Sequence, residues 1–173
     1  TDMKNKLIAA LFAFSGILVF AACEETNTNS SPPIWYGFRI DPYPAVAGDS
    51  LTVTAVQAKK GSLIHATTYK WTLTYNLDKD GINEDTVITV QQNTNYDGIS
   101  NADPTCRFYV PVNASGRATL SFEAKYAFSG NGYMGTFGND YNRPEGVRGN
   151  ITSYSGILDG GAKGSHTFYI QQQ

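Results

Sequence analysis

The sequence predicts an all-β protein, a single sandwich of two antiparallel sheets with about seven strands. Apolar and polar residues alternate with a period of two over long stretches after residue 33, which is typical of strands with one face on a core and one in water. No stretch of the same region has the period of an amphipathic helix. Aromatic residues make up 13% of the chain and charged residues only 16%, which excludes a disordered or coiled-coil protein.

The start of the chain has the pattern of an export signal. Lys4 and Lys6 give it a positive beginning, and an apolar run over residues 7–20 follows. The run is shorter than the ~20 residues that span a bilayer, and polar sequence comes directly after it. We therefore expect residues 1–22 to be a signal peptide rather than a transmembrane helix.

The end of this signal resembles the lipobox of bacterial lipoproteins, with the residues Val-Phe-Ala-Ala before Cys23. Phe20 stands where leucine is usual. The resemblance implies that a peptidase cuts before Cys23, whose thiol carries lipid, and acyl chains bind a membrane with about 0.8 kcal/mol per buried CH₂. Glu24 and Glu25 follow, and such an acidic pair resembles the signal that sends lipoproteins of the Bacteroidota to the outer face of the outer membrane.

A polar stretch without large apolar groups, EETNTNSSPP, follows the cysteine. It cannot bury enough surface to order itself, so residues 23–33 are expected to be a flexible tether and residues 34–173 the folded domain. The formal net charge of −2 gives no basic patch, which excludes nucleic acid as a partner.

Turn residues divide the domain into seven predicted strands, near residues 34–40, 50–57, 69–75, 86–92, 107–112, 117–128 and 165–171. Seven short strands with Trp71 in the third fit an immunoglobulin-like sandwich. The stretches 47–55, 69–71 and 114–120 resemble PKD-like and other immunoglobulin-like modules of bacterial surface proteins. The Asp-Phe-Gly-Asp-Gly stretch of PKD modules is replaced by TLTY after Trp71, so the resemblance implies the fold and not a function.

The segment 76–85 is a candidate calcium loop. Its oxygen-bearing candidate ligands are Asn76, Asp78, Asp80 and Glu84. The first three, followed by Gly81, match the front half of a D-x-D-x-D-G loop, in which alternate side chains converge on a hard cation. Position twelve of that pattern is Val87 instead of glutamate, and the alternative is an ordinary hairpin with an acidic turn.

The segment 129–164 is expected to be one long loop rich in glycine and aromatic residues, far longer than the usual connection. Its candidate ligand-binding residues are Tyr133, Phe137, Tyr141, Tyr154 and Arg143, with Arg148 as a further hydrogen-bond donor. Aromatic rings offer flat faces to sugars or partner side chains. The alternative is an extra hairpin or pair of edge strands whose aromatic residues fold back onto the sandwich.

Catalytic signatures are absent from the sequence, which contains no G-x-S-x-G, H-E-x-x-H or phosphate-binding glycine motif. With Cys23 lipidated, Cys106 has no disulfide partner, and we expect it to be a buried residue at the start of a strand. A catalytic Cys106 paired with His65 or His166 is the alternative. We therefore expect a protein that is not an enzyme, with a glycan-cleaving jelly roll as the remote alternative.

These features predict a non-catalytic lipoprotein anchored in the outer membrane and exposed at the cell surface. Its expected role is a binding or accessory module that captures glycan or peptide, working beside an outer-membrane nutrient importer. The alternative role is a structural or adhesion component of a surface appendage, in which exposed strand edges pair with another chain.

Overall fold

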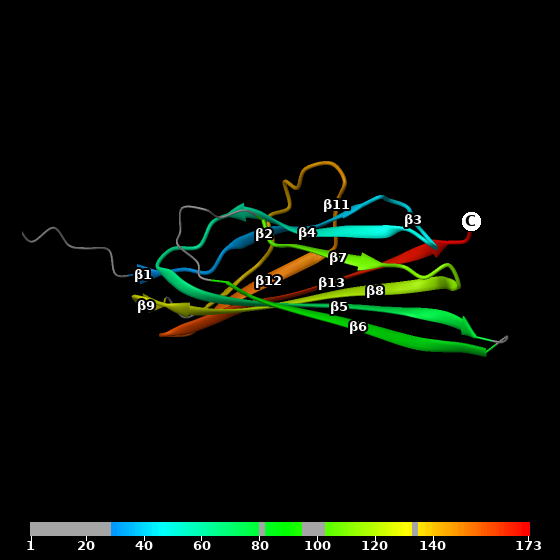
Figure 1. Ribbon diagram of the computed structural model, residues 1–173. Coiled ribbons are helices and arrows are strands. Elements are labelled where there is room, and N and C mark those ends of the chain that lie inside the picture. Colours follow the sequence, from blue (N-terminus) through cyan, green and yellow to red (C-terminus); the bar gives the residue numbers. More distant parts are fainter. Residues whose placement is uncertain (1–28, 80–81, 95–102, 133–134) are drawn as a thin grey trace, which may run out of the picture.

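The computed structural model describes residues 29–79, 82–94, 103–132 and 135–173, which form a β-sandwich (Figure 1). The strands are β1 (Asn29–Ser30), β2 (Ile34–Asp41), β3 (Ala45–Val46), β4 (Ser50–Lys59), β5 (Ile64–Lys79), β6 (Ile82–Thr94), β7 (Thr105–Tyr109), β8 (Ala114–Phe128), β9 (Asn131–Gly132), β10 (Gly135–Phe137), β11 (Val147–Arg148), β12 (Asn150–Ser155) and β13 (Asp159–Gln171). These ranges contain no helix, so the predicted all-β fold class is confirmed.

Two sheets pack face to face, and Figure 1 shows them from the side as an upper and a lower layer. The larger sheet has seven strands in the order β10-β12-β13-β8-β5-β6, with β3 paired to the end of β13. The smaller sheet has the order β11-β2-β4-β7. All neighbours along these two orders run antiparallel, whereas β3 runs parallel to β13.

The strand order follows the immunoglobulin scheme. In that scheme strands A, B and E share one sheet and strands G, F and C the other, where a strand C′ extends the edge. Here β2, β4 and β7 take the places of A, B and E, and β13, β8, β5 and β6 those of G, F, C and C′. The chain adds an excursion of four short strands between β8 and β13.

All seven predicted strands are present, and most are longer than the sequence pattern indicates. The predicted strand over 107–112 is the exception, since β7 ends at Tyr109. A turn follows it, in which the Ala114 N–H donates to the Pro111 carbonyl over 2.9 Å. The proline removes a ladder donor and starts this turn, which is why pairing stops there.

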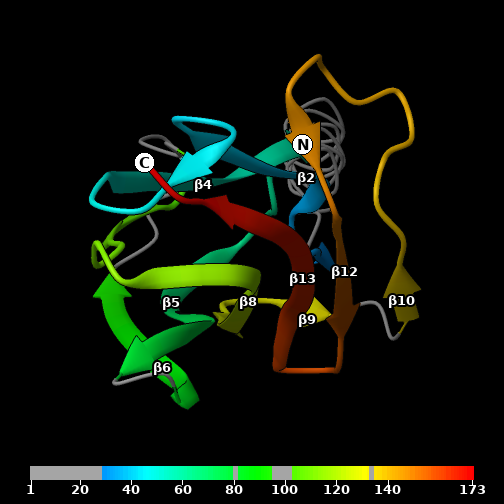
Figure 2. The same ribbon diagram turned by 90° about the vertical axis from the view of Figure 1, so that its right-hand side faces the viewer.

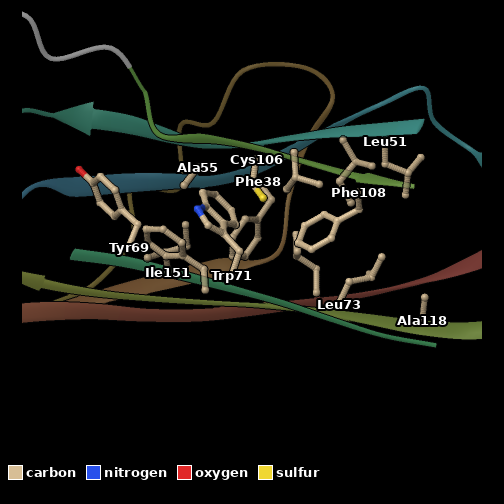
Figure 3. Close-up of a cluster of buried hydrophobic side chains, with 14 of the residues drawn as sticks. Phe38, Leu51, Ala55, Tyr69, Trp71, Leu73, Cys106, Phe108, Ala118 and Ile151 are labelled. Carbon is tan, nitrogen blue, oxygen red and sulfur yellow. The ribbon is translucent and has the colours of Figure 1, made fainter. Parts of the chain in front are cut away.

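Alternating side chains of the two sheets fill the space between them, as Figure 3 shows for Trp71, Phe38 and their neighbours. Phe122 of β8 lies at the centre of an aromatic cluster. Its ring centroid is 4.5 Å from that of Trp71, 5.5 Å from Trp35 and 5.7 Å from Tyr69. Trp71 is fully buried, as the resemblance to an immunoglobulin-like sandwich implies for a Trp in the third strand.

The folded domain begins earlier than we predicted. Residues 29–33 were expected to end the tether, but Ser30 and Pro33 are buried. Ser30 pairs with Gly132 between β1 and β9, and its hydroxyl accepts a 3.2 Å hydrogen bond from the Gly130 N–H. Contacts with residues a hundred positions away order this short polar stretch, and no local pattern indicates them.

The segment 129–164 is not one long loop, which corrects that expectation; the structure contains extra edge strands, as the alternative predicted. It contains β9, β10, β11, β12 and the beginning of β13. The buried face of β12 consists of Ile151, Ser153 and Ser155. Two serines on the inner face hide the apolar alternation that identifies a strand, and the other three strands are two or three residues long.

Candidate ligand-binding site

The segment between β8 and β13, residues 129–158, crosses from one sheet to the other at the side of the sandwich. We call it the insertion. Its strand β11 pairs with β2 at the edge of the smaller sheet, and β12 pairs with β13 in the larger sheet. Figure 2 shows β12 and β10 beside β13 on this side of the molecule. The insertion therefore closes one side of the sandwich.

Two glycines let the chain make this crossing. Gly149 joins β11 to β12 with a φ of 68°, and a Cβ there would lie 2.8 Å from the His166 Cβ. Gly37 of β2 has a φ of 136°, and a Cβ there would lie 2.5 Å from the Arg148 carbonyl oxygen. Only glycine fits either position, because its φ is in the left-handed region and a neighbouring segment of the same chain occupies the space that a side chain would need.

The crossing places Arg148 over β2 and forms a shallow, open hollow of about 340 Å³. We call this hollow the arginine pocket, and its lining residues are Arg39, Ile40, Asp41, Tyr43, Gly146 and Arg148. The guanidinium carbon of Arg148 lies 4.0 Å from the ring centroid of Tyr43. Such a cation–π contact contributes about 0.5–1 kcal/mol at an exposed site and fixes the guanidinium in place.

The arginine pocket carries an excess of positive charge, with two guanidiniums against one carboxylate. Within the described ranges neither Arg39 nor Arg148 has an ion-pair partner. The positive field reaches inward to His166, whose pKa is lowered first by burial and then by Arg148 and Arg143. A planar guanidinium binds a carboxylate through two parallel hydrogen bonds, so the pocket suits an acidic ligand.

The candidate residues predicted in the insertion do not form one common site. Phe137 is half-buried in β10, whereas Tyr141 is 82% exposed. Tyr154 lies over Gly161 of the neighbouring strand, where a Cβ would meet its ring. Arg143 donates hydrogen bonds to the Gly149 carbonyl over 2.8 Å and to Asn150 Oδ1 over 3.1 Å, so it holds the crossing in place. Tyr133 lies outside the described residues.

Sequence reasoning named Arg148 but missed its partners Arg39, Asp41 and Tyr43. These three residues belong to β2 and the turn after it, which are far from the insertion in the sequence. The paired glycines, Gly37 and Gly149, were the one available signal that two chain segments approach closely. A single glycine in a strand does not say which segment approaches it.

A second polar surface covers the outer face of the larger sheet. Lys70, Glu123 and Lys163 lie in one row across β5, β8 and β13, because Glu123 pairs with both lysines in the register. The Lys163 Nζ lies 3.7 Å from Glu123 Oε1. Two shallow cavities of about 240 and 370 Å³ share Lys70 and Glu123 among their lining residues. The neighbouring Lys125 lines the larger one, so this face is basic.

The candidate calcium loop lies at a hairpin. β5 and β6 pair continuously, with Asn76 opposite Asp85 and Lys79 opposite Ile82. Asn76 is half-buried, whereas Asp80 and the side chains of Asp78 and Glu84 lie outside the described part of the structure. Among the described residues, no group of three His, Cys, Asp or Glu side chains is placed to hold a metal ion. Calcium binding at this hairpin therefore stays a prediction.

Cys106 is buried in β7, as predicted, and is 4% exposed. Burial raises the pKa of its thiol, which keeps it protonated and poorly nucleophilic. His65 lies exposed at the start of β5, where its Nδ1 is 3.2 Å from the Ser129 hydroxyl. His166 lies under the insertion and its ring stacks on Phe168.

No family model, curated protein or solved structure matches this chain. In the described ranges no helix is long and apolar enough to cross a membrane.

Proposed function

We propose that this protein is a non-catalytic, lipid-anchored binding module that captures an acidic glycan or peptide in the arginine pocket. The observation that carries the proposal is Arg148 stacked at 4.0 Å on Tyr43, beside Arg39 in the same cavity. Arg39 and Arg148 supply paired hydrogen bonds to a carboxylate, and the Tyr43 ring packs against the apolar face of the ligand.

The pattern around Cys23 supports a place for this module on the outer membrane, facing outward. The lipid holds the domain to the membrane, and the polar stretch after Cys23 lets it reach ligands beyond the surface. We also propose that the sandwich is of the PKD-like kind, which the sequence of the stretches 47–55, 69–71 and 114–120 supports. A binding module that works beside a nutrient importer needs to be anchored on the outer face of the outer membrane.

Binding is tested with uronate-containing oligosaccharides and acidic peptides, with neutral oligosaccharides as the comparison. Arg148→Gln and Arg39→Gln are each expected to weaken binding of the acidic probes by roughly tenfold or more, since a charge-assisted hydrogen bond contributes about 1.5–3 kcal/mol. Arg107→Gln is the matched control, because Arg107 is exposed on the outer face of the same small sheet. Binding is also expected to weaken as salt is added.

Two results would contradict the proposal that the arginine pocket binds acidic ligands. One is equal binding of acidic and neutral probes, and the other is an equal effect of Arg107→Gln and Arg148→Gln. The insertion is tested separately through Tyr141→Ala, which removes an aromatic side chain that is 82% exposed. If Tyr141→Ala loses ligand binding while the Arg148→Gln and Arg39→Gln variants bind normally, the binding site lies at Tyr141 in the insertion.

The lipid anchor is tested by mass spectrometry of the amino-terminal peptide of the native protein. Acyl chains on Cys23 and removal of residues 1–22 are the expected result. Cys23→Ser should release the protein from the membrane fraction. An unmodified thiol at residue 23 would overturn the anchor and leave the pocket proposal standing.

The second candidate function is a structural component of a surface assembly. The observation that favours it is the 13-residue strand β6, which ends the order of the larger sheet and pairs only with β5 among the described strands. This candidate predicts that the arginine variants leave assembly unchanged.

A further inference from the structure

The two sides of the sandwich end very differently. On the side of the insertion, the sheets end in β10 and β11, which are three and two residues long. On the opposite side the smaller sheet ends in β7, with five residues, and the larger sheet ends in β6, with 13 residues. Figures 1 and 2 show β6 at the rim of the sheet. Among the described strands, β6 pairs only with β5.

A long free edge exposes a row of unpaired backbone N–H and C=O groups, and proteins usually protect such edges with lysine, proline, bulges or short strands. The sequence of β6, INEDTVITVQQNT, has no lysine and no proline. Its pairing with β5 runs from Ile82 to Thr94 without a register shift. Its charged residues are confined to Glu84 and Asp85, so the stretch 86–94 is uncharged and rich in β-branched residues.

We infer that β6 pairs with β6 of a second copy of this chain, antiparallel, and joins the two larger sheets into one. A two-fold axis through the middle residue, Ile88, aligns the strands over their full length and gives a closed dimer. This inference is independent of the ligand-binding proposal.

Charge favours the antiparallel arrangement. A parallel pairing in register would place Glu84 against Glu84 and Asp85 against Asp85, and like charges directly opposite each other destabilise a sheet. The antiparallel register about Ile88 places Glu84 opposite Gln92 and Asp85 opposite Gln91. The acidic positions then lie opposite amide-bearing positions instead of like charges.

The neighbouring strand adds a complementary charge. Lys70 of β5 is exposed and pairs with Gln91 in the register. In the dimer the same row continues to Asp85 of the second copy, two strands from Lys70, which is roughly 10 Å at the spacing of paired strands. Oppositely charged positions therefore lie on one face across the joint, about one screening length apart at 0.1 M salt, so their attraction is modest and weakens as salt is added.

The test measures the molar mass of the purified protein by light scattering over a wide range of concentrations. The expected result is a dimer that dissociates on dilution. Val87→Lys/Thr89→Lys should give a monomer, because it places four ammonium groups at the centre of the joint. The two positions pair with Thr74 and Thr72, on the face away from the core, so the fold should be retained.

Thr136→Lys/Thr152→Lys is the matched control, since it adds the same charge on the outer face of β10 and β12, at the other side of the sheet. It should leave the dimer intact. Amide hydrogen exchange of the unaltered protein gives a second measurement, in which protection of β6 rises with protein concentration. Three results would overturn the inference. They are a monomer at every concentration, a dimer that survives the β6 substitutions, and an equal loss of the dimer in both double variants.

Discussion

The indole Nε1 of Trp35 donates a 3.0 Å hydrogen bond to the hydroxyl of Ser153, and both side chains are fully buried. The same hydroxyl donates to the Pro33 carbonyl over 2.5 Å. One buried hydroxyl thus connects the first strand of the smaller sheet to the insertion in the larger one. Both its hydrogen-bonding functions are used, as burial of a polar group requires.

Ser153→Ala should lower the free energy of unfolding by about 1–3 kcal/mol, because it leaves the Trp35 N–H and the Pro33 carbonyl unpaired in the interior. Urea unfolding measures the change. Thr152→Ala is the matched control, since Thr152 is the exposed neighbour on the same strand. Equal stability of the two variants would show that the hydrogen bonds do not contribute.

The strands that carry the core could be predicted from the sequence, because Trp71 and Leu73 in β5 and Leu120 and Phe122 in β8 alternate with polar residues. The strand β12 could not, because its buried Ser153 stabilises the structure through hydrogen bonds to Trp35 and Pro33 rather than through apolar burial. The alternation of apolar and polar residues in the sequence reveals which apolar side chains are buried, but it does not reveal a buried polar side chain or its hydrogen-bond partners.

The same limit applies to the arginine pocket. Arg39, Tyr43 and Arg148 meet only because β11 pairs with β2, and a pairing of two residues leaves no period in the sequence. The aromatic residues of the insertion were recognisable as unusual, but their positions depend on which strands the insertion joins. Tyr154, for example, lies over Gly161 because β12 and β13 pair in that register.

Gly149→Ala should destabilise the protein much more than Gly146→Ala. Both glycines have a left-handed φ, of 68° and 78°, which costs a side chain about 1–2 kcal/mol. A Cβ at position 146 meets nothing within 4 Å, whereas one at 149 lies 2.9 Å from the Ser165 carbonyl oxygen. Overpacking adds about 1–3 kcal/mol at Gly149 alone. Thermal unfolding of the two variants measures the difference, and equal melting temperatures would contradict the close approach.

Phe122→Ala should be among the most destabilising single changes, with a loss of about 3–5 kcal/mol, because Phe122 contacts rings from both sheets and its removal leaves a cavity. Such a loss is a large share of the stability of a domain of this size. Tyr169→Ala removes an aromatic ring that is 69% exposed and should change the urea midpoint little. A small loss at Phe122 would mean that the cluster collapses to fill the cavity.

His166 should make the stability of the domain depend on pH. Its Nε2 is buried without a hydrogen-bond partner, and its pKa in the folded protein lies below the ordinary value of 6.5, first because of burial and then because of Arg148 and Arg143. Near neutral pH the imidazole is uncharged in both states and has no effect. As the pH falls below about 6.5, His166 becomes protonated in the unfolded chain but stays neutral in the folded protein. The free energy of unfolding therefore decreases until the pH reaches the pKa of His166 in the folded protein.

Urea unfolding at several pH values between about 7.5 and 5.5 measures this slope. His166→Leu should flatten it, because leucine does not titrate and its cross-strand partner is the buried Leu120. His65→Leu, which removes the other, exposed histidine of the chain, is the matched control. If both variants retain the same slope, the loss of stability in acid arises from other groups, and the charge of the arginine pocket does not reach the interior.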